Sequence, residues 1–342
     1  MRLDINLEIV AEEWDARLRE FGGTAYHAAA WADYRVAGQP NATPVFYTLI
    51  SDHEEAVGMA LGFRTRSARR WLSGLTGRLE FDAMPAVKDN GLQTCMEFIR
   101  LIEDDARHHG DTVLAFGSFA SPDRGEILKA CHFTPRRRLE FELDITRSED
   151  DLWMSMKSKR RSNIKKACRQ GVVVADLPPE EGVAALRHLQ AASAKRIVER
   201  GGRDITYKGN PRNDPVFTLA SGGLGRLVGA RVDGEIVSAY LFKCFNGLAY
   251  HTLSGHNRTA LKTQAPTLLL WETLKRYKAE GMTRLNLGGC SADAVNEDSP
   301  EHGVYRYKRD WGGEVLQCTS GRKVLRPVAH GLVQTVRKAF GR

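Results

Sequence analysis

The stretch GRLVGARVDGEIVSAYLFKCFNGLAYHTL (residues 225–253) decides the fold. It holds three runs rich in β-branched and aromatic residues, a composition typical of β-strands. Asp233-Gly234 separates the first two runs and Asn246-Gly247 the last two, and both dipeptides are strong signals for a two-residue hairpin turn. The stretch therefore predicts three antiparallel strands, over residues 225–232, 235–245 and 248–253.

The residues on either side extend this meander into an α/β layer. A polar loop over residues 254–265 leads to a helix that begins at Pro266, since proline is favoured in the first helical turn, and runs to Ala279. Gly281 ends this helix, and a strand follows over residues 283–287. Upstream of the meander we expect a basic helix at 150–170, a strand at 172–175 and a helix at 179–200.

The first half of the chain shows the same alternation. Its expected helices cover residues 12–21, 28–36, 91–109 and 122–130, and its expected strands cover 45–50, 57–64, 111–116 and 139–145. The helix at 91–109 has apolar residues at helical spacing and is closed by Gly110. The expected fold class is mixed α/β, with two domains of similar order in a chain of 342 residues.

Composition restricts the class of protein and its partners. A net charge of +8 and a pI near 9.2 favour acidic partners such as nucleic acid or an anionic membrane face. The six cysteines contain no C-x-x-C pair, which argues against a zinc site and a disulfide framework, so we expect no metal. The acidic N-terminus argues against a signal peptide, and the lack of a long apolar run argues against a membrane span. We therefore expect a cytoplasmic location.

Residues 303–313, Gly-Val-Tyr-Arg-Tyr-Lys-Arg-Asp-Trp-Gly-Gly, alternate aromatic and basic side chains. The run fits either a strand or a helix, and in both cases Lys308 is flanked by groups that can orient it. Aromatic residues before a Gly-Gly turn are also commonly explained by packing alone. The run by itself leaves these two interpretations open.

The segment from Tyr305 to Glu314 resembles the Y-x-F-K-x-x-F-G-G-E signature near the end of the FemABX family. This family comprises aminoacyl-tRNA-dependent peptidyltransferases built from two GNAT-like domains. Three more segments agree in order with the family: Trp153–Gly171, which contains RSNIKKA; Tyr250–Trp271; and Asn286-Leu287-Gly288-Gly289, where members often have D-F-G-G. The resemblance covers most of the chain and is strongest from about residue 150 to residue 315.

The resemblance implies two tandem GNAT-like domains. Residues 1–147 would form the acceptor side, residues 148–316 the donor and catalytic side, and residues 317–342 a segment that returns to the first domain. The implied activity is FemX-like: an amino acid from aminoacyl-tRNA is joined through an amide bond to an amine acceptor. The acceptor is either a peptidoglycan precursor peptide or a natural-product amine. Charged tRNA is then the co-substrate, no cofactor is needed, and we expect a monomer.

The resemblance also assigns candidate site residues. Lys308 is the expected catalytic residue, as the charge nearest the reacting ester, and no Ser/His/Asp or Cys/His constellation is needed or evident. The candidates for substrate binding are Arg35, Arg196, Tyr250, Tyr305 and Arg306. The candidates for tRNA binding are Lys157, Arg160, Arg161, Lys165, Lys166, Arg258 and Lys262. The residues 157–169 carry seven basic residues and no acidic one, a density that suits a phosphate backbone, although a solvated basic helix face is the simpler alternative.

Three features depart from the family pattern. Trp31 is followed four residues later by Arg35, where the family often has a lysine that helps to bind the acceptor. Asn286 replaces an acidic residue. No long heptad pattern interrupts the second domain, so the coiled-coil arm of some cell-wall members is absent from the prediction. The first and third departures favour an acceptor other than a standard cell-wall precursor.

The C-terminal segment from Val324 to Phe340 has apolar residues at helical spacing on a basic background. Such a helix either docks on an anionic membrane surface or packs back on its own domain. We expect the helix to pack on its own domain, and we keep a membrane surface as the alternative partner.

Two other functions remain. A conventional GNAT enzyme that uses acyl-CoA needs a glycine-rich pyrophosphate loop between strand and helix, but residues 254–265 hold only Gly255. A non-catalytic RNA-binding protein would use the basic helix, but that leaves the signature around Lys308 unexplained.

Overall fold

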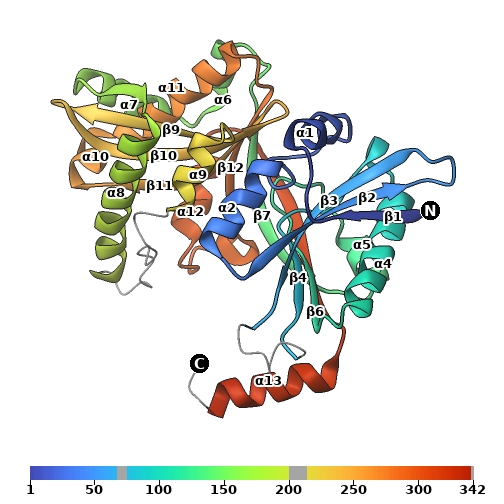
Figure 1. Ribbon diagram of the computed structural model, residues 1–342. Helices are drawn as coiled ribbons and strands as arrows, with labels where there is room; N and C mark the ends of the chain where they lie inside the picture. The colour runs from blue at the N-terminus through green and yellow to red at the C-terminus, as the bar shows by residue number, and fades with distance from the viewer. Residues whose placement is uncertain (68–74, 200–213, 340–342) are drawn as a thin grey trace. The chain divides into compact units, whose positions relative to one another are not determined.

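The computed structural model describes residues 1–67, 75–199 and 214–339. The chain divides into two compact units, Met1–Arg138 with Gln317–Arg342, and Leu139–Leu316. Both units are mixed α/β layers, which confirms the predicted fold class (Figure 1). The two division points fall inside two strands, Thr134–Asp144 and Glu314–Val324. The sequence placed the domain boundaries at residues 147/148 and 316/317.

The first unit is built on strands in the order β1-β2-β3-β4-β6-β13. Their bounds are β1 Arg2–Asn6, β2 Ala42–Ile50, β3 Ala56–Thr65, β4 Arg78–Phe81, β6 Val113–Phe116 and β13 Glu314–Val324, and β5 (Ala86–Val87) pairs with β3. The helices are α1 Ala11–Glu20, α2 Ala29–Gly38, α4 Leu92–His108, α5 Gly125–Ala130 and α13 Pro327–Ala339. The apolar face of α4, including Phe98, Ile99 and Ile102, is buried against the strands, as its helical spacing predicts.

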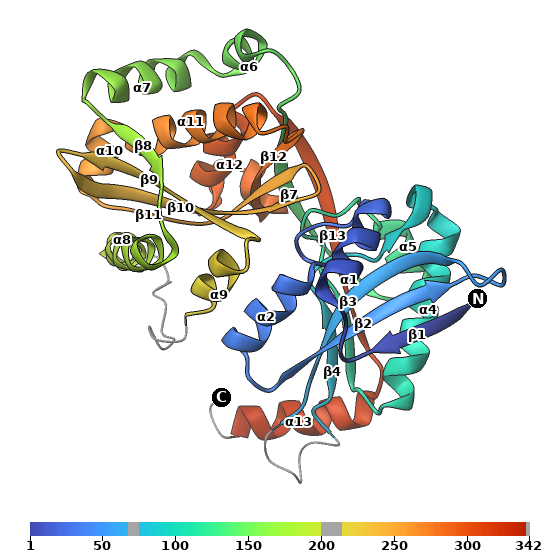
Figure 2. The same cartoon turned by 45° about the horizontal axis from the view of Figure 1, so that its top comes forward.

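The second unit has strands in the order β7-β12-β11-β10-β9-β8. Their bounds are β7 Thr134–Asp144, β8 Val173–Asp176, β9 Gly225–Val232, β10 Glu235–Phe245, β11 Leu248–His256 and β12 Arg284–Ser291. The helices are α6 Glu149–Ser155, α7 Ser158–Arg169, α8 Pro179–Glu199, α9 Pro215–Ser221, α10 Arg258–Thr263, α11 Ala265–Ala279 and α12 His302–Arg309. Helix α8 covers one face of this sheet, and α7 and α11 lie on the other (Figure 2).

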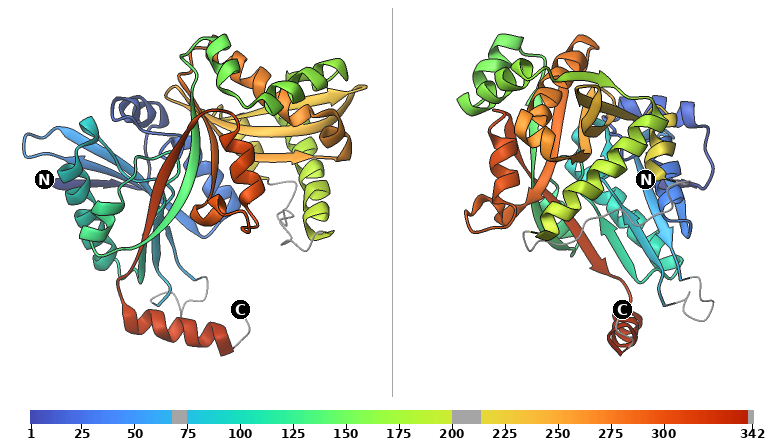
Figure 3. Two further views of the ribbon diagram at one scale, coloured as in Figure 1. Left: turned by 180° about the vertical axis from the view of Figure 1, so that it is seen from behind. Right: turned by 90° about the vertical axis from the view of Figure 1, so that its left-hand side faces the viewer.

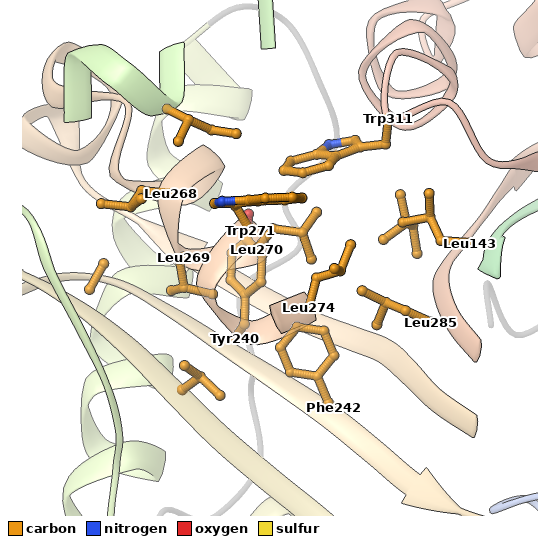
Figure 4. Close-up of a cluster of buried hydrophobic side chains, with 14 of the residues drawn as sticks. Leu143, Tyr240, Phe242, Leu268, Leu269, Leu270, Trp271, Leu274, Leu285 and Trp311 are labelled. Atoms are coloured by element: carbon orange, nitrogen blue, oxygen red, sulfur yellow. The ribbon is translucent and has the colours of Figure 1, made fainter. Parts of the chain in front are cut away.

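The core of the second unit lies between the sheet and α11. Trp271 and Leu274 of α11 pack with Phe242 of β10 and Leu285 of β12, and Trp311 covers the cluster from the end of α12 (Figure 4). Ten of the 15 residues of α11 are buried, eight of them apolar, and burial of this apolar area stabilises the unit. This core fixes where α12 ends, and therefore where Lys308 lies.

Several local predictions need correction. The single basic helix expected at 150–170 is two helices, α6 and α7, because Met156 between them is extended with a ψ of 146°. The loop expected at 254–265 holds the end of β11 and the short helix α10. The ambiguous run at 303–313 is helical from His302 to Arg309. Strands β1, β4, β5 and β13 and helix α9 were not predicted.

Candidate active site

The central strands of the second unit separate part-way along their length. In the described residues β11 and β12 pair in parallel at three positions, and the last pair is Tyr250 with Asn286. Strand β11 continues to His256 and β12 to Ser291, so their C-terminal halves diverge. Backbone N–H and C=O groups along the diverging edges leave the ladder there and become available to other partners. We call this opening the split.

Each strand carries an irregularity directly after the last pair. Phe242 of β10 pairs with His251 and Leu241 pairs with Leu253, so Thr252 is an extra residue that forms a β-bulge in β11. Gly288 of β12 has a φ of +71°, in the left-handed region that glycine adopts without strain. The bulge bends β11 and the glycine turns β12, and together they account for the split.

Lys308 extends from α12 into the split. Its Nζ donates a hydrogen bond of 2.9 Å to the carbonyl oxygen of Gly289 on β12. A Cβ atom on Gly288 would lie 2.9 Å from the carbonyl oxygen of His251 and 3.5 Å from this Nζ. Gly288 therefore leaves the space that the ammonium group of Lys308 occupies.

His251 follows Tyr250 on the diverging part of β11, and the sequence analysis missed it. Its ring stacks on Tyr240 with ring centroids 4.5 Å apart. Burial, followed by the charge of Lys308, lowers the pKa of His251 to about 3, so its imidazole is neutral near pH 7. Its position directly after a predicted site tyrosine was the one signal available in the sequence.

A buried polar cluster lies at the point where the strands separate. The Tyr250 hydroxyl donates to Oε1 of Glu140 at 2.7 Å, and Asn286 Nδ2 donates to Oε2 of the same carboxylate at 2.9 Å. The amide oxygen of Asn286 accepts a 2.8 Å hydrogen bond from the backbone N–H of Gly288. The cluster thus connects β7, β11 and β12 to the glycine beside Lys308. Glu140, like His251, was not among the predicted site residues.

The other two candidates on α12 have different environments. Tyr305 packs edge-to-face on Phe141 of β7 at 5.7 Å between ring centroids, and the Arg309 guanidinium lies 5.4 Å from the Tyr305 ring. Arg306 is exposed. Tyr305 therefore holds α12 on the sheet, and Arg306 stays accessible to a ligand.

The predicted basic segment separates into internal and exposed groups. Arg160 is buried, with its guanidinium 4.1 Å from the ring centroid of Tyr307 and 3.7 Å from the Asp310 carboxylate. Arg161 donates to the last carbonyl oxygens of α6, including that of Met154 at 3.2 Å. These two side chains serve the fold. The exposed cations of the segment are Lys157, Lys159, Lys165, Lys166 and Arg169.

The remaining candidates of the second unit lie around α8 and α10. Arg196 donates to the Ala192 carbonyl oxygen and the Ser193 hydroxyl, at 3.1 and 3.0 Å. Arg258 and Lys262 on α10 are exposed, and Arg258 has Glu199 at 3.6 Å.

Arg35 lies in the first unit, on α2. Its Nε is 3.3 Å from Oδ2 of Asp82, and Trp31 donates to the same oxygen at 2.9 Å. Arg35 also lies over the ring of Phe63 at 4.8 Å. The arginine is therefore held by an acid and a ring, with its side chain 24% exposed.

The connection from β11 to α11 has few features that could bind a pyrophosphate. Pro266 has no N–H, and the N–H of Thr267 donates to the Gln264 carbonyl oxygen at 3.0 Å. Ala265, Pro266 and Thr267 are all buried. Gly255 is required for packing against α8, since a Cβ atom there would lie 2.6 Å from the backbone nitrogen of Gln190.

The first unit has no equivalent opening among its described residues. Its parallel pair, β4 and β6, stays joined beyond the strand ends, where Gly117 donates to the Phe81 carbonyl oxygen at 2.6 Å and Phe119 to that of Asp82 at 3.2 Å. The described residues also contain no cluster of three or more His, Cys, Asp or Glu side chains suited to a metal ion. No described helix has the length and apolar character that crossing a bilayer requires.

Comparison with known proteins agrees with this geometry. Residues 155–309 match the acetyltransferase (GNAT) domain family. The crystal structure of FemX matches 97% of this chain and 100% of its own, with a TM-score of 0.78 and 13% sequence identity. The fold is FemX-like. The FemX-like fold confirms the resemblance seen in the sequence, and the split lies within the matched GNAT domain.

Two further structures share the FemX-like fold more distantly. L-PGS from Bacillus licheniformis has a TM-score of 0.59 and 14% identity over 98% of this chain and 99% of its own. A tandem GNAT protein from the clavulanic acid biosynthesis pathway has a TM-score of 0.52 and 15% identity over 94% of this chain and 98% of its own. No curated protein sequence matches the chain.

Proposed function

We propose that this protein is an acyltransferase that moves an amino acid from aminoacyl-tRNA to an amine and forms an amide bond. The observation that carries the proposal is the position of Lys308, whose ammonium group lies in the split of the GNAT domain, 2.9 Å from the Gly289 carbonyl oxygen. The likeness to FemX and L-PGS, and the matched GNAT domain, support the class of reaction.

The proposed reaction requires the protein to position the two substrates and to stabilise the charge that develops on oxygen. The neutral amine attacks the ester carbonyl carbon, a C–N bond forms, and the C–O bond to the terminal ribose breaks. The amine loses one proton and the departing ribose oxygen gains one. Lys308 stabilises the negative charge that develops on oxygen, and one oriented donor of this kind is worth about 10²- to 10³-fold in rate. A neutral His251 next to it adds no repulsive charge.

The donor is proposed to be tRNA because exposed cations lie on one helix near the GNAT core. Helix α7 packs on α11, and Lys165 and Lys166 are exposed on it. Lys157 is exposed at the residue before the helix. Such a group of cations suits a phosphate backbone. Arg258 and Lys262 on α10 are the other exposed candidates.

The alternative donor is an acyl-CoA, and the tandem GNAT protein of the clavulanic acid pathway is a structural relative whose description names AcCoA. A pyrophosphate at the start of α11 would need free N–H groups there. The proline, the bonded N–H of Thr267 and the burial of the first turn argue against this donor. We keep it as the second candidate.

The acceptor is proposed to be an amine on a peptidoglycan precursor or on a natural product. Arg306 is the proposed contact in the second unit for an anionic part of this acceptor, and Arg35 stays a separate candidate in the first unit. Tyr250, Tyr305 and Arg196 hold internal contacts, so their proposed role is to shape the site. No cofactor enters this reaction.

The test uses purified protein, total tRNA charged with labelled amino acids, and candidate amines, with acetyl-CoA in a parallel reaction. The proposal is supported if RNase abolishes the transfer and if Lys308→Ala lowers its kcat at least 100-fold. Lys275→Ala is the matched control, since Lys275 forms a surface pair with Glu272 at 3.0 Å. Thiol release from acetyl-CoA without use of charged tRNA would establish the second candidate. Binding of uncharged tRNA with no transfer would indicate an RNA-binding protein.

A further inference from the structure

The positive charge of the chain is concentrated at its C-terminus. Residues 322–342 contain six Lys and Arg side chains and no Asp or Glu, so they carry +6 of the net +8, and residues 1–321 carry only +2. A chain that is nearly neutral elsewhere thus ends in a strongly basic segment, most of which forms α13.

Helix α13 lies against the first unit through one face. Ala329 is 6% exposed, and Leu325 just before the helix is equally buried. His330 and Val333 line a small cavity of about 50 Å³ together with Arg78 of β4 and Val113 of β6. Through this face the helix packs on the first unit, to which it belongs, and Figure 3 shows α13 from two sides.

The other face of α13 is apolar and open. Val328 is 80% exposed and Leu332 is 55% exposed. Because they are four residues apart, they lie on the same side of the helix. Val328 has the largest exposed fraction of any large apolar residue in the described part of the chain. Arg322 near the end of β13 and Arg326 directly before the helix are exposed, and the helix itself contains no acidic residue.

We propose that α13 docks this protein on an anionic lipid bilayer. Val328 and Leu332 insert among the acyl chains near the headgroups, and Arg322 and Arg326 face the lipid phosphates. A helix that is apolar on its outer side, that contains no acidic residue and that follows exposed arginines has the pattern of an interfacial membrane helix. Neither this proposal nor its test depends on the proposed enzymatic activity.

The pair of aliphatic side chains favours lipid over the other occupants. The phosphates of RNA attract the basic residues but gain nothing from Val328 and Leu332, and a second copy of this chain would bring a like charge of +6 to the same surface. Only a bilayer with anionic headgroups matches both the apolar side chains and the charge.

The test is co-sedimentation of the full chain with vesicles of phosphatidylcholine alone or mixed with phosphatidylglycerol. We expect binding to the mixed vesicles only, weakened by added salt. The double variant Val328→Ser, Leu332→Ser should bind about tenfold or more weakly, because the inserted apolar groups are lost. The matched control is Val173→Ser on β8, where the valine is 61% exposed in the second unit. It should bind like wild type.

Four outcomes overturn the proposal. They are no binding to mixed vesicles, equal binding to both vesicle types, wild-type binding by the double variant, and a concentration-dependent dimer that the double variant abolishes. Circular dichroism and thermal unfolding of the double variant should match wild type, since both serines replace exposed side chains. A single variant, Val328→Ser, repeats the measurement if the double variant is less stable.

Discussion

Tyr250 and Asn286, the last paired residues of β11 and β12, donate hydrogen bonds to the two oxygens of one buried carboxylate, that of Glu140. Glu140 as a whole is 1% exposed. One side chain from β7 therefore joins the two strands at the residues after which they separate. The position of the split depends on this polar cluster as well as on the bulge and the glycine that follow it.

The cluster predicts the effect of placing an acid at position 286, where the resemblance in the sequence leads us to expect one. Asn286→Asp places a second carboxylate beside Glu140 and removes the donor that Glu140 uses, so we expect a loss of about 3 kcal/mol or more in the free energy of unfolding. The double variant Glu140→Gln, Asn286→Asp restores a donor opposite an acceptor and should recover most of the loss. Urea unfolding of both single variants and the double variant measures the coupling. Additive effects would show that the two side chains do not interact.

Gly288 and Gly281 form a matched pair for the split. Both have positive φ, +71° and +84°, so alanine strains the backbone at either position by about 1–2 kcal/mol. A Cβ at Gly281 meets nothing within 4 Å, whereas at Gly288 it lies 2.9 Å from the His251 carbonyl oxygen and 3.5 Å from Lys308 Nζ.

We therefore expect Gly281→Ala to lose stability and keep transfer activity, and Gly288→Ala to lose stability and at least 90% of kcat, as one misplaced catalytic group costs about 10²-fold. Transfer assays and thermal unfolding of both variants decide this. Equal activity in the two variants would remove Gly288 from the site.

Alanine substitutions at two residues of the basic segment should have different effects on stability. Arg160→Ala removes a buried cation from between Tyr307 and Asp310, so we expect a loss of about 2–3 kcal/mol in stability. Lys166→Ala removes an exposed cation from α7 and should leave stability within about 0.5 kcal/mol.

If α7 binds tRNA, Lys166→Ala weakens tRNA binding and lowers the slope of log affinity against log salt by about 1. Filter binding at several salt concentrations measures this slope. An unchanged slope, combined with unchanged affinity, would exclude Lys166 from the tRNA surface.

His27 predicts acid sensitivity of the first unit. It is buried with its Nε2 2.8 Å from the Met84 carbonyl oxygen, and burial lowers its pKa from 6.5 to about 4. Between these values the folded protein binds fewer protons than the unfolded chain. Stability is therefore full above about pH 6.5 and falls by about 3 kcal/mol as the pH drops to about 4.

Urea unfolding from pH 7 to pH 4 measures the effect for His27. His27→Gln keeps hydrogen-bonding groups without a titrating ring, so its stability should depend less on pH. His53→Gln is the control, because His53 is exposed. The same pH dependence in wild type and His27→Gln would assign the acid sensitivity to other groups.

Local patterns in the sequence were sufficient for most of the secondary structure. Hairpin turns at Asp233-Gly234 and Asn246-Gly247 place β9, β10 and β11, since both turns require positive φ that Asn, Asp and Gly tolerate, and all four residues have it. The order of motifs also identified the FemX-like fold, and it made Lys308 the candidate catalytic residue. Strands β1 and β13 escaped prediction, because a strand at one end of the chain is specified by its distant partner more than by its own residues.

The sequence by itself determined the alternation of elements, the basic character of residues 157–169 and the family signature, because each depends on residues close together in the chain. Only the tertiary structure decided which of those residues act together. It buried Arg160 against Tyr307, bent β11 and β12 apart after Tyr250 and Asn286, and brought Glu140 to both from more than a hundred residues away. Long-range pairing and burial set these positions, and neither leaves a local pattern in the sequence.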